Sequence, residues 1–292
     1  MKVENAAIGD LGVGGGAGDA VSIAYSPCPN DTFVFHAWAH GLVSDAPPVE
    51  VTFADIDVTN QLIGRAEALD VMKISYAALP DALTDYQLLP CGGALGRGCG
   101  PLVLARPGAT AAGGGSGLAG ASVVVPSLKS TAYLLFRRWL EAQGTSLDAV
   151  TISVMPFEQI MPTVRDGGAD AGLVIHEARF TYPDFGLGCL ADLGEWWEGE
   201  TGAPIPLGAI VARRGLGPER IAQITRVIRE SVQYAFDHPE ASHDYVMEHA
   251  QEMDPKVAQA HIGLYVNEFT RDLGPEGFAA IERLLGIKLE AA

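Results

Sequence analysis

Short apolar runs alternate along the chain with segments whose apolar residues recur at helical spacing. Runs such as VSIAY and ASVVV are rich in β-branched residues, which is typical of buried strands. Segments such as AYLLFRRWL carry apolar side chains three or four positions apart, which predicts amphipathic helices. Strands are expected at residues 21–25, 49–54, 68–74, 121–125, 150–155, 171–175 and 207–212, and helices at 57–69, 75–83, 130–143, 157–166 and 218–238. This alternation predicts βαβ units and a largely parallel sheet, and therefore an α/β fold.

Two glycine-rich segments interrupt the pattern. Residues 1–19 contain few large apolar side chains, and we expect them to form a flexible leader. Residues 107–120, PGATAAGGGSGLAG, are the strongest change in composition inside the chain and predict a surface loop or linker. Strands and helices start again after this segment, and everything beyond residue 217 is predicted to be helical.

Length and charge exclude several kinds of partner. The chain has 292 residues, of which 48% are apolar, so it can bury a sizeable core and fill two domains. Its 36 acidic and 19 basic side chains give a net charge of −17, which repels phosphate. We therefore expect neither a nucleic acid nor an anionic membrane surface as a partner. A small anion is not excluded, because it responds to the local field of one site.

The distribution of apolar residues and cysteines bears on the compartment. No apolar run approaches the ~18 residues needed to span a bilayer. The N-terminus has one lysine and no apolar core of signal-peptide length, so we expect a cytoplasmic protein. The cysteines are scattered without a CxxC pair, which favours reduced thiols and argues against a metal site. They are Cys28, Cys91, Cys99 and Cys189.

Polar residues stand where several predicted strands end, which is the edge at which open α/β sheets bind ligands. In SPCPNDTF, Asn30 or Asp31 either caps the first helix or faces a ligand. Lys73 and Ser75 flank Ile74, and an ammonium with a hydroxyl suits a carboxylate; a surface lysine beside a capping serine is the alternative. The hydroxyls of Ser130 and Thr131 open the helix after ASVVV.

Histidine and arginine supply further candidates. His176 directly follows the strand AGLVI, and imidazole is the side chain best suited to accept a proton near neutral pH; a hydrogen-bonded structural histidine is the alternative. Arg97, in GGALGRGCGPLV, either binds an anion or pairs with an acidic surface residue. His36 and His40 are four residues apart, but no third ligand completes a metal site. Histidines of the C-terminal helices are expected in solvent; they are His238, His243, His249 and His261.

Taken together, these motifs resemble the 1,4-dihydroxy-6-naphthoate synthase family of the futalosine route to menaquinone. SPCPNDTF, KISYAA, GGALGRGCGPLV, GLVIHEARFTY and LGEWWEGETGAPIPLGAI occur in the family's order between about residue 21 and residue 265. Ser130–Thr131 departs from the Thr–Thr pair of relatives but keeps the hydroxyl. The resemblance implies a periplasmic-binding-protein-like (type II) fold with two α/β lobes and a ligand cleft between them. The first lobe would contain residues 20–106 and 207–292, and the second residues 107–206.

The resemblance also implies an activity. The expected enzyme is a carbon–carbon lyase that converts cyclic dehypoxanthinyl futalosine to 1,4-dihydroxy-6-naphthoate and dihydroxyacetone. No metal and no organic cofactor is implied. By similarity, His176 is the proton acceptor, and the substrate is bound by Lys73, Ile74, Ser75, Ser130 and Thr131. Asn30 and Arg97 are our further candidates for contact with this small anionic substrate.

A fold does not determine a function, so we also consider two other functions that occur on this fold. One is a non-catalytic solute-binding protein for small anions, which usually needs a signal or a lipid anchor. The other is the chorismate dehydratase of the same pathway. The segments HEARFTY and KISYAA favour the synthase. The sequence leaves open whether the protein forms a homodimer.

Overall fold

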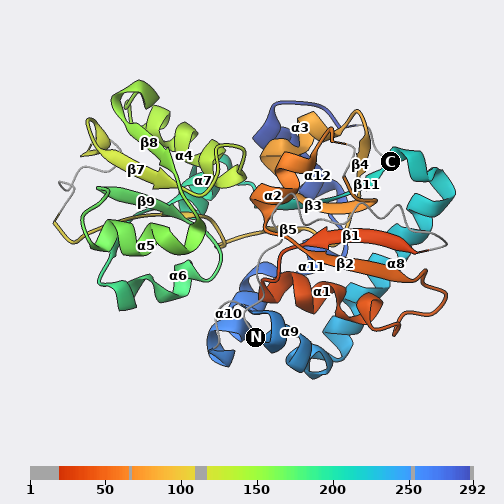
Figure 1. The fold of residues 1–292 in the computed structure, drawn as a ribbon. Coiled ribbons are helices and arrows are strands. Elements are labelled where there is room, and N and C mark those ends of the chain that lie inside the picture. Colours follow the sequence, from red (N-terminus) through yellow and green to blue (C-terminus); the bar gives the residue numbers. More distant parts are fainter. Residues whose placement is uncertain (1–19, 66–67, 109–116, 251–253, 290–292) are drawn as a thin grey trace. The chain divides into compact units, whose positions relative to one another are not determined.

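The computed structural model describes residues 20–65, 68–108, 117–250 and 254–289. The expected leader at residues 1–19 and most of the expected linker at residues 107–120 lie outside these ranges. The chain divides into two compact units (Figure 1): unit 1 contains Met1–Gly96 and Pro206–Ala292, and unit 2 contains Arg97–Ile205. Among the described helices, none combines the length and the apolar character that crossing a bilayer requires.

Unit 1 is built on one mixed sheet with the strand order β2-β1-β3-β11-β4, and β5 pairs with β11. The strands are β1 Val21–Tyr25, β2 Val49–Phe53, β3 Val71–Ser75, β4 Tyr86–Leu88, β5 Ala94–Gly96 and β11 Ile205–Arg213. β1 is parallel to β2 and β3, whereas β11 is antiparallel to β3 and β4. Every residue of β1 and β3 is buried, including the polar residues Ser22, Lys73 and Ser75.

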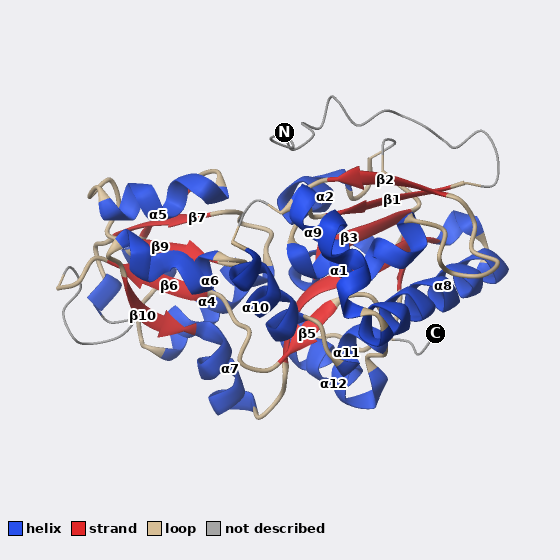
Figure 2. Cartoon of the chain, turned by 90° about the horizontal axis from the view of Figure 1, so that it is seen from below, coloured by secondary structure: helices blue, strands red, loops and turns tan. Residues whose placement is uncertain are grey.

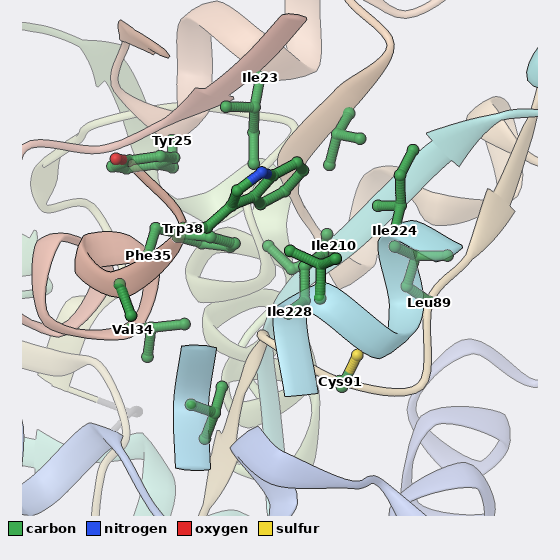
Figure 3. Packing of buried hydrophobic residues seen from close by; sticks show 14 of the residues in the cluster. Ile23, Tyr25, Val34, Phe35, Trp38, Leu89, Cys91, Ile210, Ile224 and Ile228 are labelled. Carbon is green, nitrogen blue, oxygen red and sulfur yellow. The ribbon is translucent and has the colours of Figure 1, made fainter. Parts of the chain in front are cut away.

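Helices from both ends of the chain cover this sheet. They are α1 Pro29–Ala39, α2 Ile56–Leu62, α3 Leu79–Ala82, α8 Pro218–Asp237, α9 His243–His249, α10 Pro255–Tyr265, α11 Glu268–Arg271 and α12 Gly274–Leu285. Ile23 of β1 and Ile210 of β11 meet Trp38 of α1 and Ile228 of α8 in one core (Figure 3). The apolar stripe predicted for α8 is the face that packs here. Both α1 and α8 therefore lie on the same face of the sheet.

Unit 2 has a second mixed sheet with the strand order β10-β6-β9-β7-β8. Its strands are β6 Leu102–Ala105, β7 Ser122–Val125, β8 Thr151–Val154, β9 Ala171–Val174 and β10 Gly188–Asp192. Its helices are α4 Thr131–Ala142, α5 Phe157–Arg165, α6 Ala178–Thr181 and α7 Leu193–Thr201. Figure 2 shows β6, β9 and β10 as neighbouring strands, with β1, β2 and β3 side by side in the other unit.

Two expectations about the sheets need correction. The sheets are mixed rather than largely parallel, because β11 returns antiparallel to β3, and β6 is antiparallel to both β9 and β10. We placed residues 97–106 in the first lobe, but β6 pairs inside the sheet of unit 2. The chain therefore leaves unit 1 before β6 and not after it.

The same strand pairing occurs in both units. Ile23 pairs with Val71 between β1 and β3, and Val123 pairs with Ala171 between β7 and β9. Each pair of strands is tied by a serine and by an aspartate 48 residues later, an arrangement that we call the Ser–Asp clasp. Its members are Ser22 with Asp70, and Ser122 with Asp170.

Hydrogen bonds within the two clasps match one by one. The aspartate Oδ2 accepts from the serine backbone N–H and from the serine hydroxyl, at 3.0 and 2.9 Å in unit 1 and at 2.8 Å for both in unit 2. The aspartate backbone N–H donates to the serine Oγ at 3.0 Å in unit 1 and 3.1 Å in unit 2. Each unit thus contains a three-strand parallel core of the same construction.

Candidate functional site

Helix α1 begins directly after the loop that follows β1. We predicted Asn30 or Asp31 as its N-cap, but the helix starts at Pro29 and its N-cap residue is Cys28. Proline is favoured in the first helical turn because its ring sets φ and it has no N–H to leave unsatisfied. Asn30 and Asp31 therefore lie inside the first turn, and both side chains are buried.

Asp31 forms an ion pair with Lys73 of the neighbouring strand β3. Lys73 is 6% exposed and Asp31 is 1% exposed, so the alternative of a surface lysine does not hold. Burial raises the pKa of the Asp31 carboxyl, and the charge and hydrogen bond of Lys73 oppose that rise. The charge of Lys73 is matched inside unit 1 by the Asp31 carboxylate.

A chain of hydrogen bonds leads from this ion pair to helix α10. Asn30 Nδ2 donates to Asp31 Oδ1 at 2.8 Å, and His261 Nε2 lies 3.1 Å from Asn30 Oδ1. His261 was expected in solvent, but it is 1% exposed. The reason is its place on α10: Ala258, His261 and Tyr265 are the buried positions of this helix. We call His261, Asn30, Asp31 and Lys73 the buried polar chain.

Ser75 is the last residue of β3 and not the first of a helix. The helix predicted over residues 75–83 is replaced by a 3₁₀ turn at Tyr76–Ala78 and by α3. Asn60 of α2 makes two hydrogen bonds with Ser75. Its amide nitrogen donates to Ser75 Oγ at 3.0 Å, and its side-chain oxygen accepts from the Ser75 backbone N–H at 2.8 Å. Ile74, between Lys73 and Ser75, is fully buried.

Gly208 of β11 makes room for the lysine side chain. It pairs with Ser75, and a Cβ atom at this position would lie 2.8 Å from Lys73 Cε. Any larger residue would push the lysine side chain from its place. Unit 1 therefore brings Lys73, Asn30 and Ser75 to the carboxyl end of its parallel strands.

In unit 2, Ser130 is the N-cap of α4. Its Oγ accepts from the Tyr133 backbone N–H at 3.1 Å and donates to the Ser127 carbonyl at 3.1 Å. Ser130 and Thr131 are both buried. The cap explains why the helix starts at this position, and the Ser130 hydroxyl has protein partners for its proton and for one lone pair.

His176 follows β9 in an uncommon backbone conformation. Its φ is +53°, in the left-handed region that only a few per cent of non-glycine residues adopt. The half-buried imidazole packs edge to face against Phe157 of α5, with ring centroids 5.6 Å apart. Strain of this kind costs about 1 kcal/mol or more and is concentrated at functional sites. β9 and β7 are parallel neighbours, so His176 follows the same sheet edge as the start of α4.

Arg97 contacts the C-terminal end of helix α7. Both of its terminal nitrogens donate to the Gly202 carbonyl at 3.2 Å, and Nη1 lies 3.6 Å from Glu198. Glu198 and Gly202 are at the end of α7, where a cation is favourable. The acidic surface partner that the sequence left open is therefore present, and a contact of Arg97 with substrate stays a prediction.

The histidine pair of α1 belongs to an aromatic cluster. The rings of His36 and His40 are 4.4 Å apart, and Tyr245 of α9 lies 4.7 Å from both His40 and His249. Burial lowers the pKa of His36 and of His249. We call His36, His40, Tyr245 and His249 the histidine cluster.

Taken alone, neither unit brings three His, Cys, Asp or Glu side chains among its described residues within reach of one ion.

Sequence reasoning did not foresee the buried hydrogen bonds of Asp31, His261 and Asn60. Asp31, in SPCPNDTF, was considered either as a helix cap or as a group that faces a ligand, and its pairing with Lys73 was not foreseen. His261 stands at helical spacing from Ala258 and Tyr265, and this spacing could have indicated a buried position. The repeated separation of Ser22 from Asp70 and of Ser122 from Asp170 could have revealed the shared core.

Comparisons with known proteins agree with the fold and with the motifs. A family model described as menaquinone biosynthesis matches residues 21–289. Over 268 residues the chain is 63% identical to a 1,4-dihydroxy-6-naphthoate synthase of Streptomyces coelicolor, which covers 91% of this chain and 92% of the relative. It is 46% identical over 268 residues to a synthase of the same name from Thermus thermophilus, covering 91% and 93%.

Solved structures extend the comparison to the fold. A protein of Archaeoglobus fulgidus superposes with a TM-score of 0.82 at 31% identity, covering 93% of this chain and 97% of that one. The periplasmic aliphatic sulphonate binding protein of Escherichia coli superposes with a TM-score of 0.68 at 13% identity, covering 92% and 86%. At that identity only the fold is shared. The expectation of a periplasmic-binding-protein-like fold is confirmed.

Proposed function

The chain belongs to the menaquinone biosynthesis family, and on that premise we propose that it catalyses the reaction of its synthase relatives. The reaction releases dihydroxyacetone from cyclic dehypoxanthinyl futalosine and leaves 1,4-dihydroxy-6-naphthoate. The observation that carries this proposal is the 63% identity over 268 residues with a synthase of that name. We further propose that the enzyme acts in the cytoplasm.

His176 is the proposed proton acceptor. Loss of a three-carbon fragment leaves an aromatic product, so the reaction is favoured and needs chiefly a base and correct orientation. A strained φ of +53° sets the direction of the His176 side chain at the end of β9. Phe157 packs edge to face against one side of the ring, which restricts its rotation. Both features support a base held in one orientation.

Lys73 is the proposed partner of the substrate carboxylate. An ammonium has three N–H donors, so Lys73 can keep Asp31 and still bind a second carboxylate. Burial of Lys73 lowers the local dielectric and strengthens such a contact. Ser75 and Ile74 continue the same strand end, and we assign them to the substrate as well. Ser130 and Thr131 are proposed to bind substrate at the start of α4.

The test is incubation of the purified protein with cyclic dehypoxanthinyl futalosine and, separately, with chorismate, followed by mass spectrometry of the products. We expect 1,4-dihydroxy-6-naphthoate and dihydroxyacetone from the first substrate and no dehydration of the second. Dehydration of chorismate would identify the sister enzyme of the pathway. Binding without turnover would identify a solute-binding protein.

Replacement of the base is the sharper test. We expect His176→Asn to lower kcat about 10²–10⁴-fold, because a positioned general base contributes that much. Asparagine tolerates the left-handed backbone region, so the fold should persist. His243→Asn, at an exposed position of α9, is the matched control and should turn over like the wild type. Near-normal turnover of His176→Asn would refute the assignment of the base.

A further inference from the structure

The buried polar chain contains a histidine to which the proposed reaction gives no role. His261 lies on α10, 231 residues along the chain from its partner Asn30. All four members of the chain are nine-tenths or more buried. A hydrogen bond between two buried polar groups favours a single arrangement, because breaking it leaves a buried donor or acceptor without that partner.

The direction of each hydrogen bond in the chain is determined by chemistry. Lys73 can only donate, so Asp31 Oδ1 accepts from it. Asn30 donates to the same oxygen through Nδ2, at 2.8 Å, which leaves Asn30 Oδ1 as an acceptor. His261 Nε2, 3.1 Å from Asn30 Oδ1, must therefore carry its proton and donate it. Removing that donor leaves a buried carbonyl oxygen without its partner.

We propose that His261 is a positioning residue for the Lys73 ammonium. Its Nε2–H holds the amide of Asn30, Asn30 holds Asp31, and Asp31 holds Lys73 in the place where it binds a carboxylate. Loss of the donor frees the first turn of α1 to shift, and the ion pair shifts with it. The binding role of Lys73 in this inference rests on the proposed function, whereas the placement of Lys73 does not.

Two substitutions separate hydrogen bonding from packing. His261→Phe keeps a ring of similar size against Tyr265 but has no donor. His261→Gln loses the ring but offers an amide N–H to Asn30. If His261 positions Lys73, the Phe variant is impaired and the Gln variant is rescued; if His261 only fills space, the order is reversed.

The first readout does not depend on any substrate. Lysines are acetylated with a limiting reagent, and the rate at Lys73 is compared by mass spectrometry with the rate at exposed Lys129 in the same molecule. We expect the ratio of rates to rise about fivefold or more in His261→Phe and to stay within about twofold of the wild type in His261→Gln. Equal protection of Lys73 in the wild type and in His261→Phe would overturn the inference.

The second readout is kinetic. Lys73 binds the carboxylate before and during the reaction, so its displacement should raise KM about tenfold and leave kcat within about threefold. His261→Gln should restore KM. A fall in kcat with unchanged KM would overturn the positioning role. A wild-type protein that turns over no substrate, while the labelling ratio rises as expected, would refute the proposed function and support the placement of Lys73 by His261.

Discussion

The parallel cores of the two units have the same construction but carry different chemistry. β1 and β3 pair as β7 and β9 do, and each pair is closed by a Ser–Asp clasp. Val71 of β3 and Ala171 of β9 are equivalent positions. Two residues after them, unit 1 has Lys73 and unit 2 has Leu173. The lysine position carries a buried ion pair with Asp31, and the leucine position is fully buried and apolar. The backbone frame therefore does not require a charge at this position, so the ion pair is a feature of unit 1 and not of the shared core.

The strand ends differ in the same way. After β3 the chain continues into a 3₁₀ turn at Tyr76, which is fully buried. After β9 the corresponding residue is His176, which is half buried and has a positive φ. The first end is held by packing and the second is strained. Unit 1 thus has a buried, hydrogen-bonded polar arrangement at its strand end, and unit 2 has a side chain held in a strained backbone conformation.

Replacing Lys73 with leucine, the residue at the equivalent position of unit 2, should have the largest effect on stability. Lys73→Leu leaves Asp31 as a buried charge without a partner, and we expect a loss of about 3–5 kcal/mol in the free energy of unfolding. The double variant Lys73→Leu with Asp31→Asn removes both charges and should recover stability to within about 1–2 kcal/mol of the wild type. Urea unfolding measures both values.

Lys129→Leu, at an exposed lysine of unit 2, is the matched control and should change stability by less than about 0.5 kcal/mol. Both variants that lack Lys73 should lose substrate binding. A single variant as stable as the wild type would show that Asp31 does not depend on Lys73, and the contrast between the two cores would then lose its basis.

Removing the clasps tests whether the two cores are equivalent. Asp70→Ala and Asp170→Ala each delete an acceptor of two hydrogen bonds at a partly buried carboxylate, and we expect a loss of about 1–2 kcal/mol from each. Hydrogen exchange followed by mass spectrometry should place each loss in its own unit. Asp166→Ala, at an exposed carboxylate of unit 2, should have little effect. A clasp that could be deleted from one unit without loss would contradict the equivalence.

Lowering the pH should have the smallest of the three effects on stability, and this effect should differ between the two units. Burial first, and the neighbouring His40 second, lower the pKa of His36 below its ordinary value of 6.5, and burial also lowers the pKa of His249. The unfolded chain then binds more protons than the folded chain just below pH 6.5. Stability of unit 1 is therefore fully present above that pH and falls as the pH is lowered through the folded-state pKa values.

Unit 2 should respond at lower pH, through a carboxyl group. Its Asp170 carboxyl accepts two hydrogen bonds from Ser122, which lower its pKa below the ordinary value of 3.8. The stability that this group contributes is present above the ordinary pKa and is lost as the pH falls through the lowered one. Hydrogen exchange between pH 7.5 and 5 should show opening in unit 1 alone. His36→Phe should flatten that response, whereas His243→Asn should leave it unchanged.

Local patterns predicted most of the framework. The runs that form β1, β2, β7, β8 and β9 were located to within one or two residues, because β-branched residues and flanking turn residues mark them. β4, β5, β6 and β10 were missed; β5 and the start of β6 lie in GGALGRGCGPLV, whose glycines and proline are typical of loops. The antiparallel direction of β11 follows from the chain's return to unit 1, which no local pattern encodes.

The sequence singled out candidate residues, but it did not reveal the contacts that they make. The resemblance indicated a lyase of menaquinone biosynthesis, and the two synthase relatives confirm this expectation. Lys73 was singled out, but its partner Asp31 is 42 residues away, and a sequence does not reveal which distant charge meets it. The same holds for Asn30 and His261. The assignment of His176 as the base stays a prediction.

The route of the chain through the two units has a consequence for biosynthesis on the ribosome. Unit 2 is one continuous segment, Arg97–Ile205, so all its strands have been synthesised before β11 is complete. The sheet of unit 1 needs β11 between β3 and β4, and its core needs α8, both of which are made later. Domains generally fold as units during synthesis. We therefore expect unit 2 to fold first. Until β11 has been synthesised, β3, the strand that carries Lys73, has an unpaired edge.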